Sequence, residues 1–388
     1  MSKGVELFIK SMHVQHYKSI ADINIDFSPV TILVGPNGSG KSNVVDCLRF
    51  LKDSFVHGID YAMHERSGVN TVRQYSVSKP YRISICVGFG SKVDVLDRAS
   101  FYSCKIDSKG GDYQIFSEDA MWKENYFDEN NEEQEMELHL KRNKSGAVYI
   151  NNEEQPRKFQ TSVLSVSTFG FPIVYGGRTI KFASIYPNVL REPTRQDYDR
   201  NLKENCSNWG AYLKWMRQTK TGESAYKRIM ELMTRVLPGL EQVRVRNVGG
   251  YFVPQFQVRD KSNQKSHTFD PVQLSDGTLR VFGLLLSLYQ KPAPKFLALE
   301  EPEQTIHPGL LGVLADAVKE VSQDTQLLIT THSPYLLDYF DPEQIRVVEM
   351  NDGETTVSKI CGGQLEAVKN RLMKLSEIMA LDGLQSDC

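Results

Sequence analysis

The sequence is poor in cysteine, and the cysteines it has are not paired. Its six cysteines are scattered over 388 residues without a Cys-x-x-Cys pair, which argues against a zinc site and a disulfide framework. No apolar run approaches the ~20 residues that span a bilayer. The longest, Val281 to Tyr289, is broken by Gly283 and Ser287, and the N-terminus, Met1 to Glu6, has no signal-peptide core. We therefore expect a reduced cytoplasmic protein with no membrane association.

The sequence also lacks an excess of charge of either sign. Lys and Arg number 46 and Asp and Glu 48, a net charge of −2, so a site for a polyanion must be a local patch. No internal repeat is evident, and no long heptad run occurs, so we expect no extended coiled-coil arm. Residues 118–137, with nine acidic residues and one basic residue, are interpreted as a solvated loop or insertion.

Residues 191–246 have the opposite bias, with twelve basic and seven acidic residues. Helical patterns at Trp209–Gln218 and Ser224–Leu237 predict a helical insertion. Near the N-terminus, strands are expected at Leu7–Ile9, Ile23–Phe27 and Val30–Val34, because these segments are rich in β-branched and aromatic residues. A helix is expected over Ser42–Lys52, and residues 81–117 contain short strand-like segments.

The strongest motif is Gly35-Pro36-Asn37-Gly38-Ser39-Gly40-Lys41-Ser42, followed by Asn43. It matches the phosphate-loop pattern G-x-x-x-x-G-K-[ST] and lies between a predicted strand and a predicted helix. Its glycines let backbone N–H groups converge on phosphate oxygens, and the helix N-terminus adds a positive dipole end. Lys41 is predicted to reach the β- and γ-phosphates and Ser42 to bind Mg²⁺. The sequence thus predicts ATP and Mg²⁺ as cofactors.

A second anion site is indicated by Leu274-Ser275-Asp276-Gly277-Thr278, which precedes an apolar helix. Ser275 is able to cap that helix, and Gly277 leaves room for a close backbone approach. An ordinary helix start explains the same residues.

Two buried strands are expected to end in polar side chains at one edge of the sheet. Glu300 and Glu301 follow the apolar Phe296–Leu299, where one carboxylate can bind Mg²⁺ and the next can activate water. An acidic residue opening a helix accounts for Glu303 better than for that pair. His332 follows a second apolar strand and fits a γ-phosphate sensor.

The order of these motifs resembles the ABC-type ATPase heads of the RecF/SMC class, closely over residues 5–53 and 270–350. LSDGT resembles the ABC signature, LALEEPE with the following Thr305–Pro308 resembles Walker B and the D-loop, and ITTHSPYLL resembles the His switch. Val14–Ile20 is similar to the N-terminal strand pair of these heads.

The middle of the chain, Ile185–Pro193 and Asn208 onward, resembles compact bacterial ATPases of the AAA family. Related stand-alone heads occur in anti-phage systems, where the ATPase works with a separate effector, often a nuclease. The OLD nucleases share such a head but add a C-terminal Toprim domain. Only 56 residues follow His332, so we expect no nuclease activity from this chain alone.

The resemblance assigns roles to the motif residues. It implies that Lys41 and the phosphate loop bind ATP, that Ser42 and Glu300 bind the metal, and that Glu301 is the catalytic base. Ser275 and Gly277 would contact the γ-phosphate in trans, so ATP is expected to be sandwiched in a homodimer, with His332 as the sensor. Two features depart from the family: Glu300 stands where Asp is usual, and the Q-loop is not clear. Gln74 and Gln160 are weak candidates for it.

The fold implied is α/β, a P-loop ABC-type ATPase head with a mixed or parallel central sheet, an N-terminal antiparallel β-subdomain and a helical insertion. We expect one head over residues 1–388, divided as follows: an N-terminal lobe with Walker A at 1–117, a variable insertion at 118–190, a helical lobe at 191–246, a core with signature, Walker B and His switch at 247–350, and a C-terminal tail at 351–388.

Three functions remain open. The first is a cytoplasmic ATPase that dimerises on ATP and controls an effector in anti-phage defence, with the acidic segment and the helical insertion as partner surfaces. The second is a DNA-repair or recombination ATPase that binds duplex DNA, slightly favoured by the basic bias at 191–246, which an ordinary solvated helical face also explains. The third is an ATP sensor without efficient turnover, which the Glu300 departure suggests. An ABC transporter ATPase fits least well.

Overall fold

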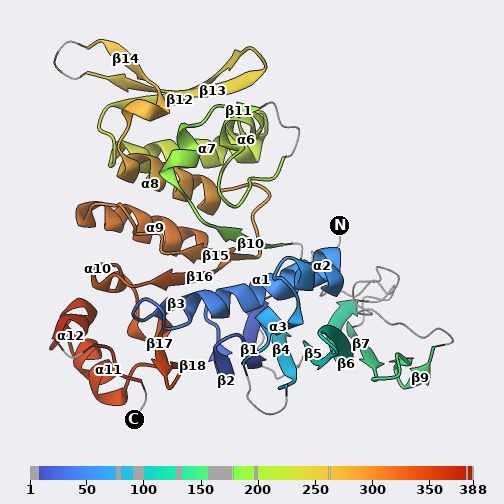
Figure 1. Cartoon of the computed structure of the whole chain (residues 1–388). Helices are drawn as coiled ribbons and strands as arrows, with labels where there is room; N and C mark the ends of the chain where they lie inside the picture. Colours follow the sequence, from blue (N-terminus) through green and yellow to red (C-terminus); the bar gives the residue numbers. More distant parts are fainter. Residues whose placement is uncertain are drawn as a thin grey trace.

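The fold was obtained as a computed structural model (Figure 1). It describes residues 8–75, 80–90, 100–127, 133–155, 177, 179–195, 200–260, 262, 264–381 and 383–386. The larger of its two sheets contains, in spatial order, β10 (Ile180–Ala183), β15 (Phe296–Glu300), β16 (Gln326–Thr331), β3 (Val30–Val34), β17 (Ile345–Asn351), β18 (Glu354–Ser358), β2 (Ile20–Asp26), β1 (Phe8–Tyr17), β4 (Ile83–Gly90), β5 (Ser100–Lys109), β6 (Asp112–Phe127), β7 (Glu133–Arg142), β8 (Val148–Ile150) and β9 (Glu153–Glu154).

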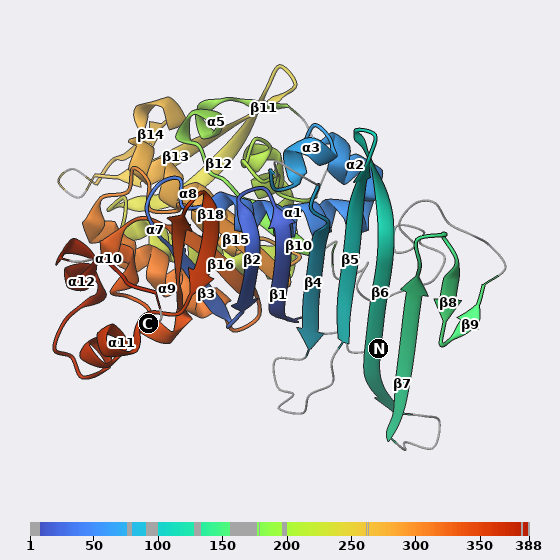
Figure 2. The same ribbon diagram turned by 60° about the horizontal axis from the view of Figure 1, so that its bottom comes forward.

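This sheet changes character along its length. The strands β10, β15, β16, β3 and β17 run parallel to one another, whereas β1, β2 and β4 to β9 pair antiparallel. Figure 2 shows β2, β1, β4, β5 and β6 side by side. The predicted α/β class and mixed sheet are confirmed, and the expected N-terminal antiparallel part is continuous with the central sheet.

The central strands are apolar throughout because both of their faces are covered. All five residues of β3 are buried. Ile32 and Leu299 belong to one core cluster with α8 (Asp276–Leu288) and α9 (Leu311–Val321), whereas Leu33 and Ala298 belong to a second cluster with α1 (Lys41–His57). In Figure 1, α8 and α9 accordingly lie on the opposite side of β15 and β16 from α1. Such two-sided burial is typical of parallel strands.

A separate small sheet accompanies the predicted helical lobe. It contains β11 (Thr194–Arg195), β12 (Leu240–Val248), β13 (Tyr251–Arg259) and β14 (Ser266–Phe269). The expected helices are present as α6 (Trp209–Met216) and α7 (Lys220–Thr234). Trp209 is fully buried and packs edge-on against Phe282 of α8 at 5.3 Å between ring centroids. This lobe therefore extends beyond residue 246, the boundary that we expected.

The remaining helices connect or flank these layers. They are α2 (Ile59–His64), α3 (Val69–Val72), α5 (Pro187–Arg191), η2 (Pro271–Gln273), η3 (Pro308–Leu310), α10 (Pro334–Leu337), η4 (Pro342–Gln344), α11 (Gly362–Lys369) and α12 (Leu375–Leu381). Among the helices in the described ranges, none is long and apolar enough to cross a membrane.

Of the two interpretations of residues 118–137, a solvated loop or an insertion, the loop is wrong, because the described part of this segment belongs to β6 and β7. Ala120 and Trp122 face the core, and Lys123 pairs with Glu137 on the opposite strand at 2.8 Å. Glu118 is buried and accepts a hydrogen bond from the Tyr102 hydroxyl at 3.0 Å. Cross-strand pairing and inward apolar residues thus stabilise strands that the acidic composition concealed.

The expected insertion at 118–190 and tail at 351–388 also contain parts of the core. Within the first, β10 is an edge strand beside β15. Within the second, β18 pairs with β17 and bridges to β2 at a single position. Residues after Asn351 therefore join the parallel and antiparallel parts of the sheet.

Candidate nucleotide site

The phosphate loop lies between the carboxyl end of β3 and the start of α1. Gly38 and Gly40 have φ values of 80° and 99°, a region that side chains with a Cβ rarely adopt. A Cβ at Gly40 would lie 1.9 Å from Thr355 Oγ1, and one at Gly35 would lie 2.1 Å from the Val348 carbonyl oxygen. These glycines are required by the backbone conformation and by packing, in addition to any contact with phosphate.

Lys41 is almost fully buried at the base of this loop. Its Nζ donates to the carbonyl oxygens of Gly35 and Pro36, both at 2.8 Å. Burial lowers the pKa of its ammonium, an effect that the carboxylates of Glu301 and Glu303 oppose. The ammonium therefore faces the loop in which phosphate oxygens are expected to bind.

Residues distant in sequence support the loop from the side. Asn43 Nδ2 donates to Ser19 Oγ at 2.6 Å, and the Ser19 and Thr355 hydroxyls are 2.6 Å apart. Thr355 also donates to the carbonyl of Ser39 at 3.2 Å. Ser42 is exposed in the first turn of α1. The buried Ser39 Oγ has no hydrogen-bond partner among the residues that the structure describes, as expected for a polar atom close to a ligand.

Glu300, the predicted metal position, lies at the end of β15 in an ion pair. Its Oε1 accepts from Arg49 Nη2 at 3.1 Å and from Ser184 Oγ at 3.4 Å. Arg49 also pairs with Glu204. Metal binding through Glu300 would therefore have to compete with Arg49.

Glu301 and His332 meet at the carboxyl ends of β15 and β16, two neighbouring strands. His332 Nδ1 lies 3.5 Å from Glu301 Oε1. Glu301 has a positive φ of 43°, and its N–H donates to the Thr330 carbonyl at 2.9 Å. Both side chains are partly exposed, at 27% for Glu301 and 43% for His332. The structure thus brings together the predicted base and the predicted sensor.

Ser275 and Gly277 lie at the N-terminus of α8. Ser275 Oγ accepts from the Thr278 N–H at 3.2 Å, so it caps the helix. A Cβ at Gly277 would lie 2.8 Å from the Thr305 carbonyl oxygen. Both residues therefore have a role within the chain, while Ser275 itself remains exposed. Their predicted contact with ATP in a second protomer stays a prediction.

Comparison with known families fits this geometry. Residues 8–169 match the family described as "AAA ATPase domain", and residues 189–338 match the family described as "AAA domain, putative AbiEii toxin, Type IV TA system". The two matches include the phosphate loop, both carboxylates and His332. Each match covers less than half of the chain, and together they show an ATPase domain of the AAA/ABC type. The predicted enzyme class is thereby confirmed, and binding of ATP follows from it.

Solved structures give the fold of this ATPase. It is similar to a SmcHead bound to the C-winged helix domain of ScpA, with a TM-score of 0.53 and 16% identity over 92% of this chain and 99% of that one. It is equally similar to an Smc head domain from Pyrococcus furiosus, with a TM-score of 0.53 and 14% identity over 94% of this chain and 99% of that one. The ATPase thus has an SMC-type head fold.

Curated relatives match a short segment only. The chromosome partition protein Smc of Halothermothrix orenii is 51% identical over 47 residues, which are 12% of this chain and 4% of that protein. The DNA replication and repair protein RecF of Porphyromonas gingivalis is 48% identical over 46 residues, which are 12% of this chain and 13% of RecF. The ATPase thus matches only a small part of each relative. The high identity within that part supports the predicted RecF/SMC kinship of the head.

The structure adds residues to the site of the ATPase that the sequence did not single out. The guanidinium of Arg280, buried in α8, donates to the carbonyls of Ile185, Pro302 and Glu301, the last at 2.7 Å. Arg280 thereby connects α8 to the turn that follows β15. The Thr355 hydroxyl is equally hard to foresee, since the pattern of β18 resembles any short strand.

The Q-loop stays unassigned. Gln74 is buried and hydrogen-bonded to His16 at 2.9 Å and to Glu354 at 3.0 Å, whereas Gln160 lies outside the described residues.

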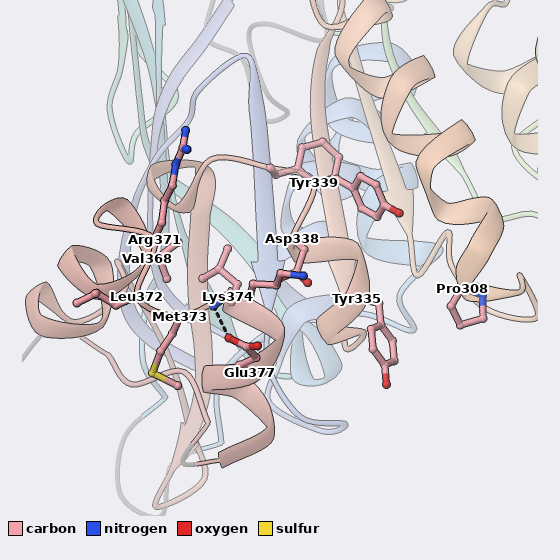
Figure 3. A pocket seen from close by; sticks show the side chains of 12 residues that line it. Pro308, Tyr335, Asp338, Tyr339, Val368, Arg371, Leu372, Met373, Lys374 and Glu377 are labelled. Carbon is pink, nitrogen blue, oxygen red and sulfur yellow. Dashed lines mark hydrogen bonds between the residues drawn. The ribbon is translucent and has the colours of Figure 1, made fainter.

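A groove of about 790 Å³ lies beside Pro308 and is lined by Pro308, Tyr335, Tyr339, residues of α11 and α12 and the residues that connect these two helices. Figure 3 shows Tyr335 and Tyr339 on the side of this groove opposite Leu372 and Arg371. It contains none of the predicted site residues.

Proposed function

We propose that this ATPase hydrolyses ATP with Mg²⁺ between two protomers and thereby controls a separate effector protein in bacterial anti-phage defence. The observation that carries the hydrolytic part is the approach of Glu301 to His332 at 3.5 Å. In this arrangement Glu301 accepts a proton from the attacking water, and His332 contacts the γ-phosphate. Lys41 balances the phosphate charge from the loop.

The residues present fit Mg²⁺ brought in with the nucleotide. In the described part of the chain no group of three or more His, Cys, Asp or Glu side chains could hold a metal by itself. Mg²⁺ usually takes one or two protein ligands together with phosphate and water. Ser42 and Glu300 would hold it here, and the ion would neutralise phosphate charge during hydrolysis.

The exposed N-terminus of α8 supports the dimer. Ser275 and Asp276 are exposed, so the γ-phosphate of ATP bound to a second protomer can reach them, as expected for an ATP sandwich. Control of an effector is supported by the description of the second family, which names a toxin of a type IV toxin–antitoxin system.

Light scattering on the Glu301→Gln variant tests this proposal. The variant should bind ATP, lose at least about 100-fold of turnover, and reach twice the monomer mass only when Mg-ATP is present. The wild type without nucleotide is the control. An unchanged mass together with turnover near the wild-type rate would contradict both the sandwich and the role of Glu301.

Duplex DNA binding is a second candidate function. It is favoured by the outer face of the β12–β13 ribbon, where Arg244 pairs in register with Gln255, and Arg246 with Val253. Both arginines are exposed; the charge of Arg244 acts on the nearby Glu241 carboxylate, which is itself paired with Arg259. A third candidate, ATP sensing without turnover, is favoured by the ion pair of Glu300 with Arg49; multiple-turnover ATP hydrolysis by the wild type would exclude it.

A further inference from the structure

The turn that carries His332 is held by hydrogen bonds to two side chains, those of Thr331 and Glu303. Thr331, the last residue of β16, is fully buried, and its Oγ1 accepts from the Ser333 N–H at 3.0 Å. The same hydroxyl donates to Glu303 Oε1 at 2.6 Å. The N–H of His332 itself points to Glu303 Oε1 at 3.3 Å. Three consecutive residues are thus fixed through Thr331 and Glu303.

Glu303 belongs to the turn after β15, so this contact links two strands of the site. Its side chain is only 6% exposed. No helix begins at Glu303, since the next helical segment is η3 at Pro308. The alternative interpretation, in which Glu303 opens a helix, is therefore wrong. Burying a carboxylate costs free energy unless hydrogen bonds offset the loss of its hydration. The burial of Glu303 therefore favours a specific role for its side chain.

The second oxygen of Glu303 supports that interpretation. Within the described ranges of the chain, Oε2 is buried without a hydrogen-bond partner. A carboxylate serving packing alone would be replaceable by an apolar side chain, whereas this one keeps one oxygen engaged and one available. The engaged oxygen faces the His332 turn.

We propose that Glu303 and Thr331 are positioning residues for ATP hydrolysis, because their hydrogen bond holds the His332 turn beside Glu301. The inference rests on the proposed hydrolysis at this site. His332 Nδ1 lies 3.5 Å from Glu301 Oε1, so a small shift of the turn would separate the two groups. Neither positioning residue needs to touch the nucleotide.

Steady-state kinetics on paired substitutions test the proposal. Thr331→Val removes the hydroxyl at nearly constant volume and should lower kcat about tenfold or more, the expected loss for a hydrogen bond to a charged group. KM for ATP should stay within about threefold because the phosphate loop is unchanged. Thr331→Ser restores the hydroxyl and should recover most of kcat. An equal loss in Thr331→Ser would overturn the proposal.

The Glu303 variants separate positioning from a role of the charge. Glu303→Gln keeps an acceptor oxygen for Thr331 and should retain more kcat than Glu303→Ala. A Gln variant as inactive as the Ala variant would make the charge itself catalytic and overturn the proposal. Because the two residues act as one unit, Glu303→Ala combined with Thr331→Val should lose no more than the worse single variant. Glu343→Gln, at an exposed pair with Lys369, is the matched control.

A measurement without ATP keeps this test separate from that of the proposed function. The imidazole NMR resonances of His332, assigned with His332→Gln, should shift in Thr331→Val, while those of His13 and His139 stay in place. A wild type without turnover would contradict the proposed function, and an unmoved His332 resonance would contradict the positioning role.

Discussion

Lys41 illustrates how burial prepares a single side chain for phosphate. Its ammonium donates to two backbone carbonyls at 2.8 Å, and burial lowers its pKa. Carbonyl dipoles compensate a buried charge less well than an anion does. A polyphosphate is therefore a stronger partner for Lys41 than its own loop.

Replacement of this lysine should remove nucleotide binding. In Lys41→Ala, ATP affinity measured by calorimetry should fall about 100-fold or more, because charge-assisted hydrogen bonds to phosphate are lost. Lys52→Ala is the control, since Lys52 lies on the same helix and contacts Asp53 and Glu204 at its surface. Unchanged affinity in Lys41→Ala would refute the assignment of the loop.

At the scale of elements, α8 combines two tasks at its N-terminus. Ser275 caps the helix through the Thr278 N–H, and Arg191 ties the same turn down through the Leu274 carbonyl at 3.0 Å. An N-cap contributes about 1 kcal/mol to stability. Both capping of α8 and contact with ATP in a second protomer would favour a serine at position 275. Only a substitution that keeps one of these two roles and removes the other can therefore distinguish them.

Ser275→Asp makes this separation. Asp caps helices as well as Ser does, so the free energy of unfolding should change by less than about 0.5 kcal/mol. Its carboxylate would repel the γ-phosphate of a second protomer, and turnover should fall about tenfold or more. Ser275→Ala is the complementary control, because it should lose about 1 kcal/mol of stability. Wild-type turnover in Ser275→Asp would leave the cap as the sole role of Ser275.

Elements with a single periodic signal could be predicted, and those with mixed signals could not. The apolar runs of β3, β15 and β16 and the glycine-rich loop indicate their structure directly. In β6 and β7, the many acidic residues indicated a solvated segment, although the alternating buried residues Ala120 and Trp122 are typical of a strand. The positioning residues were missed because Glu303 and Thr331 are 28 residues apart and meet only through sheet pairing.

At the scale of the whole molecule, one sheet runs from the nucleotide core into the antiparallel strands, and the helical lobe packs on the core through α8. The ribbon of β12 and β13 lies in this lobe, on the side of α8 away from β15 and β16 (Figure 1). A macromolecule bound to the ribbon would therefore not cover the phosphate loop.

The salt dependence of duplex DNA binding tests the second candidate function at this scale. If Arg244 and Arg246 contact phosphates, Arg244→Gln and Arg246→Gln should each reduce the slope of log affinity against log salt by about 1. Arg228→Gln is the control, because Arg228 already pairs with Glu231 and Glu320. A slope unchanged in the double variant, or no binding by the wild type, would exclude this ribbon as a DNA surface.

The contact of Thr355 with Ser39 has a consequence for biosynthesis. The two residues are 316 positions apart, and β18 joins the sheet only after nearly all other strands have been made. Chains fold during synthesis from the N-terminus onward, yet the phosphate loop, encoded near the start, lacks its contact with Thr355 until that residue leaves the ribosome, and before then Ser19 supports it from the side. A nascent chain should therefore bind ATP more weakly than the complete chain, and tight nucleotide binding would mark chains that have been translated past β18.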